Sequence, residues 1–258
     1  MVQALIDNSS TWATSIATVR QWIHEAQHVA VLTGAGVSAE SGVPTFRDDT
    51  SGYWAKFKPE EMASEVGYRK DPPYVWRWYE HRRAQIARVQ PNAGHLALAQ
   101  WAQQHPGRMT LITQNVDGLH QQAGSRDVLS LHGELRKNRW LNRRCAQCDL
   151  DNPTPGEPPH CPACGNLLRP AVVWFGESLP GATWAKAEQA AEECQLMLVV
   201  GTSGAVYPAA GLAKIARRTD SRVVIINPHA SELDSVADHL IAMPSAQVLP
   251  LLFSSLEL

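Results

Sequence analysis

The chain has 258 residues, of which 44% are hydrophobic and 19% are charged, and its formal net charge is −2. These proportions exclude an intrinsically disordered chain and fit a globular protein with one substantial core. The small net charge argues against broad electrostatic binding to nucleic acid. No apolar run is long enough to cross a membrane, and the first residues do not resemble a signal peptide. We therefore expect a cytoplasmic protein with no membrane partner.

Strand and helix patterns alternate along most of the chain. A helical stripe of apolar residues over 10–27 leads into a short β-branched run, Val29–Thr33, which predicts a buried strand. The later predicted strands are Met109–Thr113, Val128–Leu131, Leu196–Val200, Val223–Ile226 and Leu240–Ala242. The later predicted helices are 94–104, 117–122, 182–194, 208–217 and 245–253. This alternation predicts an α/β fold, a Rossmann-like doubly wound parallel sheet whose ligands lie beyond the carboxyl ends of its strands.

Two segments interrupt the alternation. Residues 51–90 are helical and aromatic, and residues 133–175 contain four cysteines and a proline-rich connector. We expect them to be a helical insertion and a zinc-ribbon insertion that together form a small domain. The large domain is then discontinuous, made of residues 1–50, 91–132 and 176–258.

Four of the five cysteines form two C-x-x-C pairs, Cys145 with Cys148 and Cys161 with Cys164. In a reducing compartment such pairs indicate a metal site. Four thiolates complete the tetrahedral shell of one Zn²⁺ and leave no open position, which predicts a structural role. A redox C-x-x-C is the alternative, but the second matching pair argues against it. For Cys194, which stands alone, we expect buried packing.

The segment after the first predicted strand begins with Gly34, Ala35 and Gly36. Without a Cβ, its glycines would let backbone N–H groups approach a phosphate. The full dinucleotide fingerprint G-x-G-x-x-G is not met, because the third glycine is displaced to Gly42. A simple tight turn is the alternative interpretation.

Polar side chains follow the next predicted strand. Gln114, Asn115 and Asp117 come directly after Met109–Thr113. Their side chains can hydrogen-bond ribose hydroxyls or an amide such as nicotinamide. Equally, they can do no more than cap the following helix. The segment alone leaves both interpretations open.

Further strand ends repeat this pattern. His132 follows Val128–Leu131, where its imidazole is either a proton acceptor near neutral pH or a structural histidine. Gly201–Ser203 and Asn227–Pro228 follow later strands and offer small or hydrogen-bonding groups. Because parallel strands end at one edge of a sheet, we expect these residues to gather there.

These segments, together with Val172–Glu177 and the two cysteine pairs, occur in the order seen in the sirtuins, and the resemblance covers residues 10–250. It implies an NAD-dependent protein lysine deacylase, in which the acyl oxygen attacks C1′ of the nicotinamide ribose, nicotinamide leaves and the acyl group moves onto ADP-ribose. The implied co-substrate is NAD⁺, the implied metal is one structural Zn²⁺, and the implied partners are acyl-lysine side chains of proteins. We expect a monomer with no direct nucleic-acid partner.

The resemblance also implies roles for individual residues. His132 would be the general base, with Asn115 and Asp117 nearest the leaving group. The implied NAD-binding residues are Gly34, Ala35, Gly36, Glu40, Thr45, Phe46, Arg47, Tyr53, Trp54, Gln114, Asn115, Val116, Asp117, His132, Gly201, Thr202, Ser203, Asn227, Pro228, His229 and Ser245. The implied substrate-binding residues are Val172, Val173, Trp174, Phe175, Gly176 and Glu177, which would pair as a strand with the substrate backbone.

Residues 72–89 predict an amphipathic helix. Its apolar stripe contains Val75, Tyr79, Arg82, Ile86 and Val89. A guanidinium on that side needs an anionic partner, either an internal carboxylate or a substrate. The Tyr79-x-x-Arg82 pair resembles the sirtuin subgroup that removes succinyl and malonyl groups, which implies desuccinylation and demalonylation beside deacetylation. The stretch Asp48–Ser51 is more acidic than is usual in that subgroup.

Two other functions stay open from the sequence. Protein mono-ADP-ribosyl transfer shares the co-substrate and its cleavage step. A non-catalytic NAD-sensing or zinc-ribbon nucleic-acid-binding module is the other alternative, since residues 136–144 beside the cysteines are rich in arginine. The presence of His132 and of the Tyr79/Arg82 pair favours the deacylase.

Overall fold

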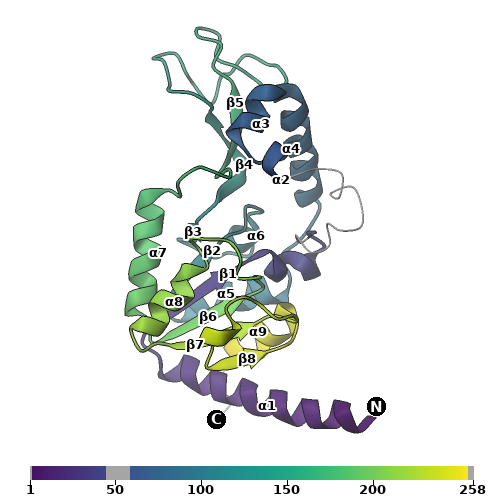
Figure 1. Cartoon of the computed structure of the whole chain (residues 1–258), viewed down its shortest axis with the longest axis vertical. Helices are drawn as coiled ribbons and strands as arrows, with labels where there is room; N and C mark the ends of the chain where they lie inside the picture. The colour runs from purple at the N-terminus through teal and green to yellow at the C-terminus, as the bar shows by residue number, and fades with distance from the viewer. Residues whose placement is uncertain (1, 45–58, 255–258) are drawn as a thin grey trace.

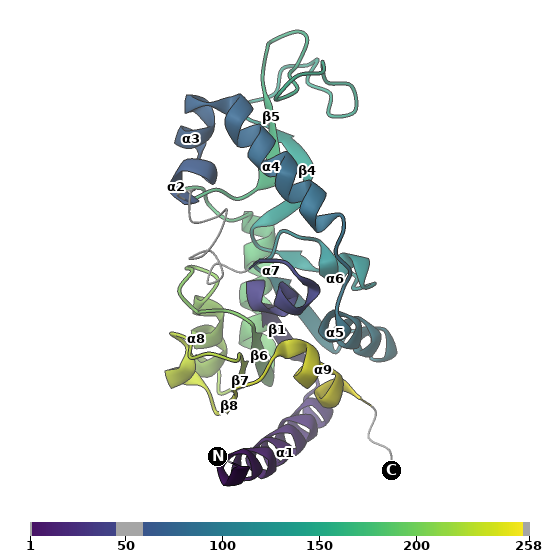
Figure 2. The same ribbon diagram turned by 90° about the vertical axis from the view of Figure 1, so that its right-hand side faces the viewer.

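The computed structural model describes residues 2–44 and 59–254, in which a large parallel sheet is flanked by helices and a smaller module lies beside it (Figures 1 and 2). The sheet has the strand order β3-β2-β1-β6-β7-β8, and all of its neighbouring strands are parallel. Its strands are β1 Val29–Thr33, β2 Met109–Thr113, β3 Leu129–Ser130, β6 Leu196–Val200, β7 Arg222–Ile226 and β8 His239–Ile241. The strand order reverses between β1 and β6, so this is the switch point at which doubly wound sheets bind ligands. The predicted fold class is confirmed.

The central strands are apolar on both faces, and every residue of β1 and β6 is buried. Alternate residues contribute to two cores. On one face pack α1 (Val2–Glu25), α5 (Ala93–Gln104) and α9 (Ser245–Phe253), and on the other pack α7 (Gly181–Glu193) and α8 (Gly211–Arg218). This two-sided cover holds the carboxyl ends of the strands in fixed positions.

The smaller module is built from two separate segments of the chain, one before β2 and the other after β3. Its helices are α2 (Pro59–Met62), α3 (Glu65–Lys70) and α4 (Pro72–Ile86), and its antiparallel strands are β4 (Gly133–Trp140) and β5 (Leu168–Val172). The helices and strands share one core, whose buried members are Met62, Tyr68, Val75, Trp78, Tyr79, Ile86, Leu135, Val172 and Trp174. Figure 1 shows α3 and α4 lying against β4 and β5.

Arg83 links the two parts of the module. Its Nε donates to the Leu135 carbonyl at 2.7 Å, and its Nη2 donates to Asn138 Oδ1 at 2.6 Å. Thus the two insertions predicted from the sequence pack against each other.

The start of α4 is fixed by its first residues. Asp71 accepts a hydrogen bond from the Tyr74 N–H, and proline follows at the first helical position.

The structure differs from the sequence-based expectations at two points. The strands β4 and β5 were not predicted, because charged residues and a bulge between Glu134 and Asn138 hide their alternation. α1 begins at Val2 rather than at residue 10, since no glycine or proline interrupts its sequence. Residues 173–177 pair with no other strand of the described chain, and their pairing with a substrate backbone stays a prediction. Within the described ranges, no helix has the length and apolar character needed to span a bilayer.

Candidate active site

The loops after β1 and β6 touch each other at the switch point. The N–H of Gly34 donates to the Val200 carbonyl at 2.9 Å, and the N–H of Gly36 donates to the Gly201 carbonyl at 2.7 Å. A Cβ on Gly34 would lie 2.7 Å from Cβ of Thr202, and one on Gly36 would lie 2.7 Å from Cα of Gly201. These glycines are therefore required for contact between the loops. Their own N–H groups are engaged within the protein, which differs from the phosphate role inferred from the sequence.

A pocket opens beside this contact, between the short helix η1 (Ala35–Ser41) and the start of α9. Its lining residues are Gly36, Ala39, Glu40, Gly201, Ile226, Pro228, Pro244 and Ser245. Glu40 accepts hydrogen bonds from the Ala246 N–H at 2.8 Å and from Ser245 Oγ at 3.3 Å. Its carboxylate thus lies at the N-terminus of α9, where the helix dipole favours negative charge. Several residues that the sequence assigned to NAD meet in this pocket.

Hydrogen bonds to Thr202 connect the ends of β2, β6 and β7. Gln114 Nε2 donates to Thr202 Oγ1 at 3.2 Å, and Asn227 Nδ2 donates to the Thr202 carbonyl at 3.1 Å. The three residues follow strands that are distant in sequence. Their meeting is what the convergence of parallel strand ends predicts.

Asn115 and Asp117 meet at Ser38 of η1, a residue that the sequence analysis missed. Asn115 Nδ2 donates to Ser38 Oγ at 3.2 Å and to the Gly34 carbonyl at 3.0 Å. Ser38 Oγ donates to Asp117 Oδ2 at 2.8 Å, while Asp117 Oδ1 accepts the N–H of Leu119, the first residue of α6 (Leu119–Gln122), at 2.8 Å. The capping interpretation and the site interpretation of Asp117 are therefore compatible.

The two buried histidines His95 and His120 contact each other, and His95 lies next to Ser38. His95 Nδ1 accepts the Asn92 N–H at 3.3 Å, so the neutral ring carries its hydrogen on Nε2, which lies 3.4 Å from Ser38 Oγ. His120 Nε2 lies 2.9 Å from Thr33 Oγ1, and the two imidazole rings are 4.8 Å apart. Burial lowers the pKa of His95 to about 4 and that of His120 to about 3, so both rings are neutral at pH 7.

His132 lies between β3 and β4. Its Nδ1 is 2.9 Å from the Gln114 carbonyl, which can only accept, so Nδ1 carries the hydrogen and Nε2 is unprotonated. Burial lowers the pKa of His132, although the hydrogen bond to the Gln114 backbone opposes this shift. The result is a neutral imidazole with one nitrogen fixed and the other able to accept a proton.

The predicted substrate-binding segment, residues 172–177, connects the module to the large domain. Its backbone N–H groups are largely engaged within the protein, and those with partners belong to Val173, Trp174, Phe175 and Glu177. The Val172 and Trp174 carbonyls also accept hydrogen bonds, from Arg169 Nη2 at 2.6 Å and from the Glu177 N–H at 3.0 Å. The side chain of Phe175 is 54% exposed, so it presents an apolar surface next to these carbonyls.

A buried ion pair fixes the shape of this segment. Arg169, only 1% exposed, pairs through Nη1 with Glu177 Oε1, and its Nη2 donates to Glu177 Oε2 at 3.1 Å. The same Nη2 donates to the Val172 carbonyl at 2.6 Å. Burial raises the pKa of Glu177, but the hydrogen bond from Arg169 outweighs it and holds that pKa below its ordinary value. No local sequence pattern marks Arg169 as a site residue, because its partner lies in an irregular segment.

Tyr79 and Arg82 lie one turn apart on α4. Tyr79 is 2% exposed, and its hydroxyl oxygen accepts a hydrogen bond of 2.9 Å from Trp174 Nε1. Burial raises the pKa of Tyr79 to about 12, so it is protonated at pH 7. Arg82 is partly exposed, and its guanidinium carbon lies 4.9 Å from the ring centroid of Trp78.

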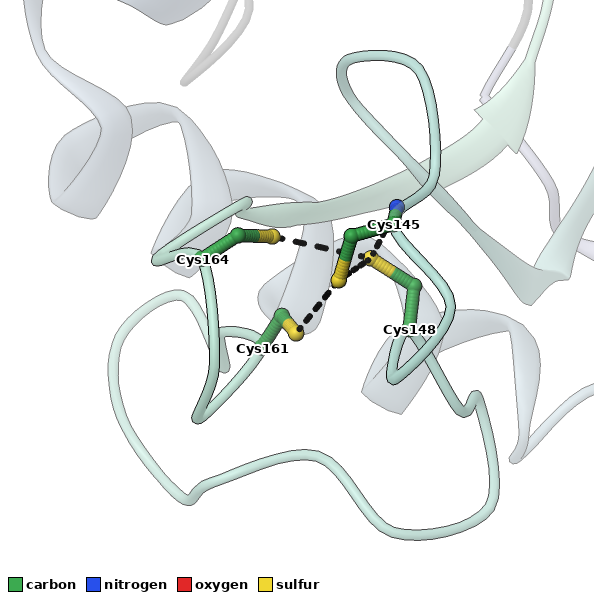
Figure 3. Close-up of side chains that lie close together, drawn as sticks. All are labelled: Cys145, Cys148, Cys161 and Cys164. Carbon is green, nitrogen blue, oxygen red and sulfur yellow. Dashed lines mark hydrogen bonds between the residues drawn. The ribbon is translucent and has the colours of Figure 1, made fainter.

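The four paired cysteines, which lie between β4 and β5 in the sequence, converge in space (Figure 3). Sulfur atoms of Cys145 and Cys148 are 3.6 Å apart, those of Cys145 and Cys161 3.8 Å, and those of Cys148 and Cys164 3.7 Å. A tetrahedral zinc ion with Zn–S bonds of about 2.3 Å separates its sulfur ligands by about 3.8 Å. The cluster therefore fits one Zn²⁺ ion.

The remaining predicted site residues are distributed as follows. Ser203 Oγ accepts the Ala205 N–H at 3.4 Å, the Val116 carbonyl accepts the Leu135 N–H at 2.9 Å, and His229 is exposed. Five predicted NAD-binding residues lie outside the described part of the chain: Thr45, Phe46, Arg47, Tyr53 and Trp54. The roles assigned to individual residues stay predictions.

Comparison with known proteins agrees with this arrangement. The sequence model of the Sir2 family matches residues 34–208. The chain is 54% identical over 238 residues to a Ralstonia nicotianae protein named NAD-dependent protein deacylase, covering 92% of this chain and 96% of the relative. An Aquifex aeolicus protein of the same name is 46% identical over 214 residues, which is 83% of this chain and 89% of that protein.

Solved structures agree as well. A Sir2 homologue in complex with NAD has a TM-score of 0.80 and 40% identity, with 92% of each chain covered. A Sir2 protein bound to an acetylated peptide has a TM-score of 0.75 and 28% identity, with 88% of this chain and 92% of that chain covered. The chain belongs to the Sir2 family, and the resemblance to the sirtuins is confirmed.

Proposed function

We propose that the chain is an NAD-dependent protein lysine deacylase that removes acetyl, succinyl and malonyl groups. Its relatives in R. nicotianae and A. aeolicus are named NAD-dependent protein deacylase, and similar structures hold NAD or an acetylated peptide. The observation that carries the proposal is His132, whose neutral imidazole is fixed at Nδ1 and can accept a proton at Nε2.

When bound, NAD⁺ supplies the electrophilic C1′ of its nicotinamide ribose, from which nicotinamide departs. The residues around the switch point fit such a co-substrate. Gly36, Gly201, Glu40 and Ser245 line the pocket, and a Cβ on either glycine would clash with the backbone of the facing loop. The amide groups of Gln114 and Asn115 lie at the adjacent strand end and suit the ribose and carboxamide.

His132 would take the proton from a ribose hydroxyl. Its carbonyl also accepts the Val173 N–H at 2.8 Å, so the residue connects the site to the predicted substrate-binding segment. A substrate backbone paired with that segment would be held in a fixed geometry relative to the base, which would favour reaction by orientation.

The acidic-acyl part of the proposal rests on Tyr79 and Arg82. A carboxylate accepts hydrogen bonds only, and both residues donate: Arg82 through its guanidinium and Tyr79 through a hydroxyl that stays protonated at pH 7. Arg82 is partly exposed, so a ligand from solvent can approach it.

The four cysteines would hold one Zn²⁺ ion in a structural role, because four thiolates leave no coordination position for substrate. We also propose the domain division predicted from the sequence, with residues 51–90 and 133–175 in the small domain. The core shared by α3, α4, β4 and β5 supports it.

Cytoplasmic location and a monomeric state are further parts of the proposal. The cysteines of the described chain form no disulfide with one another, which suits a reducing compartment. Size-exclusion chromatography with light scattering tests the oligomeric state.

The test of the function is incubation of purified zinc-loaded protein with NAD⁺ and peptides that differ only in acetyl-, succinyl- or malonyl-lysine. We expect nicotinamide, free lysine peptide and acyl-ADP-ribose in equal amounts, measured by mass spectrometry. ADP-ribose attached to protein without peptide deacylation would instead indicate mono-ADP-ribosyl transfer. No turnover of NAD⁺ with any peptide would contradict both activities and favour a non-catalytic module.

A further inference from the structure

Trp174 lies beneath the predicted acyl-binding pair and touches it through one hydrogen bond. Its Nε1 donates to the hydroxyl oxygen of Tyr79 at 2.9 Å, and both side chains are almost fully buried. An indole N–H can only donate, so the direction of this bond is fixed. The Tyr79 oxygen is the acceptor, and its own hydrogen must point elsewhere.

The Tyr79 hydrogen has no acceptor among the residues that the structure describes, because the bond from Trp174 is the one hydrogen bond of this hydroxyl there. The hydroxyl therefore has one unused donor. An ionised carboxylate accepts hydrogen bonds and cannot donate them, which makes it a matching partner. Receiving the indole N–H also polarises the phenol and strengthens its donation.

The indole ring is held in place from both the module core and the ion pair. The guanidinium of Arg169 lies 3.2 Å from the Trp174 ring centroid, and the ring of Tyr68 lies 5.1 Å away. Glu177 in turn pairs with Arg169 and accepts the Trp174 N–H of the backbone at 2.9 Å. Because the ring cannot turn without breaking these contacts, the direction of its Nε1–H is fixed.

We propose that Trp174 is a positioning residue for acyl selectivity: its indole N–H orients the Tyr79 hydroxyl so that it donates to the carboxylate of an acidic acyl group. An acetyl group has no carboxylate and gains nothing from this orientation. The inference rests on the proposed activity toward succinyl-lysine and adds a residue to the determinants of that selectivity.

The test is Trp174→Phe, which keeps an aromatic ring for Arg169 and removes the N–H. We measure kcat and KM of the NAD⁺-saturated, zinc-loaded protein with matched succinyl- and acetyl-lysine peptides. The ratio of kcat/KM values, succinyl over acetyl, should fall about threefold to tenfold, as expected for one lost hydrogen bond. The fall should come from KM for the succinyl peptide, since the bond contributes to binding and not to proton transfer.

A double-mutant cycle separates positioning from packing. Tyr79→Phe removes the hydroxyl, so adding Trp174→Phe to it should change the ratio no further. Trp140→Phe is the matched control, because Trp140 is a buried tryptophan whose Nε1 has no hydrogen-bond partner in the described chain. It should leave the ratio unchanged.

Three outcomes would overturn the inference. If Trp174→Phe leaves the ratio unchanged while Tyr79→Phe lowers it, Trp174 does not position the hydroxyl, and the proposed acyl preference stands. If the two changes lower the ratio additively, Trp174 acts through packing. If the unmodified protein turns over acetyl-lysine and not succinyl-lysine, the acidic-acyl part of the proposed function fails, and the inference fails with it.

Discussion

At the scale of single residues, His132 is defined by what its two ring nitrogens do. The Gln114 carbonyl fixes Nδ1–H at 2.9 Å, and Nε2 stays available. We expect His132→Ala to lower kcat/KM by about 100-fold to 10,000-fold for every acyl peptide, the usual contribution of a general base. Deacylation and NAD⁺ cleavage are measured together. Zinc content and thermal midpoint should match the unmodified protein, and full activity in the variant would exclude His132 as the base.

The pH profile follows from the lowered pKa of His132. The base works in its neutral form, and a pKa below the ordinary value of about 6.5 keeps that form populated to lower pH. Activity should therefore remain above half of its plateau at pH 6.5 and decline at lower pH. A midpoint of the decline above pH 6.5 would contradict this assignment.

Substitution of Arg82 distinguishes a role in an internal ion pair from a role in substrate binding. We expect Arg82→Met to lower kcat/KM for a succinyl-lysine peptide at least about tenfold more than for the acetyl-lysine peptide, because a charge-assisted bidentate contact is lost. Arg82→Lys should give an intermediate loss, since lysine keeps the charge and lacks the fork. Equal losses on both peptides would contradict recognition of the acyl carboxylate.

At the scale of elements, the contact between the loops after β1 and β6 depends on glycine. A Cβ at Gly36 would lie 2.7 Å from the Gly201 backbone. We expect Gly36→Ala to lower the free energy of unfolding by about 1–3 kcal/mol through overpacking, and to weaken NAD⁺ binding. Urea denaturation and calorimetric titration with NAD⁺ measure the two effects.

Gly181 provides the matched control, because nothing lies within 4 Å of a Cβ placed there. Gly181→Ala, at the start of α7, should change the free energy of unfolding by no more than about 0.5 kcal/mol. Equal stability of the two variants would show that the loops separate easily and that the close approach is not required.

At the scale of the whole molecule, the zinc cluster anchors the outer end of the module. Cys148 and Cys161 pack against Trp76, Trp140 and Leu168, so metal binding and this part of the core are coupled. We expect removal of Zn²⁺ by a chelator to lower the near-ultraviolet circular dichroism signal and to abolish activity, with both recovering when Zn²⁺ is returned.

Cysteine variants sharpen this test. Cys161→Ala should abolish zinc binding. Cys194→Ala should leave the zinc content unchanged, because Cys194 is buried among residues of α7 and β7 and is not part of the cluster. Zinc content is measured by atomic emission. Full activity of the metal-free protein would contradict a structural role for the ion.

The sequence by itself determined the parallel sheet and the metal cluster. β1 and β6 are continuous apolar runs, and the C-x-x-C spacing brings each thiolate pair together locally. Strand ends such as Gln114 and His132 were also predictable, because topology gathers them. The strands β4 and β5 were not, since charged residues conceal the alternation in β4, and β5 is a short run that contains Pro170.

Only the tertiary structure decided how the side chains pair. Ser38 meets Asp117 across 79 residues of sequence, and Tyr79 meets Trp174 across 95. No local pattern encodes such contacts, because the sequence around each partner determines only its own helix or loop. The two side chains meet only when these elements pack together in the folded protein. For the same reason, the sequence predicted that the N–H groups of Gly34 and Gly36 would be available to a phosphate. In the fold they donate to the Val200 and Gly201 carbonyls.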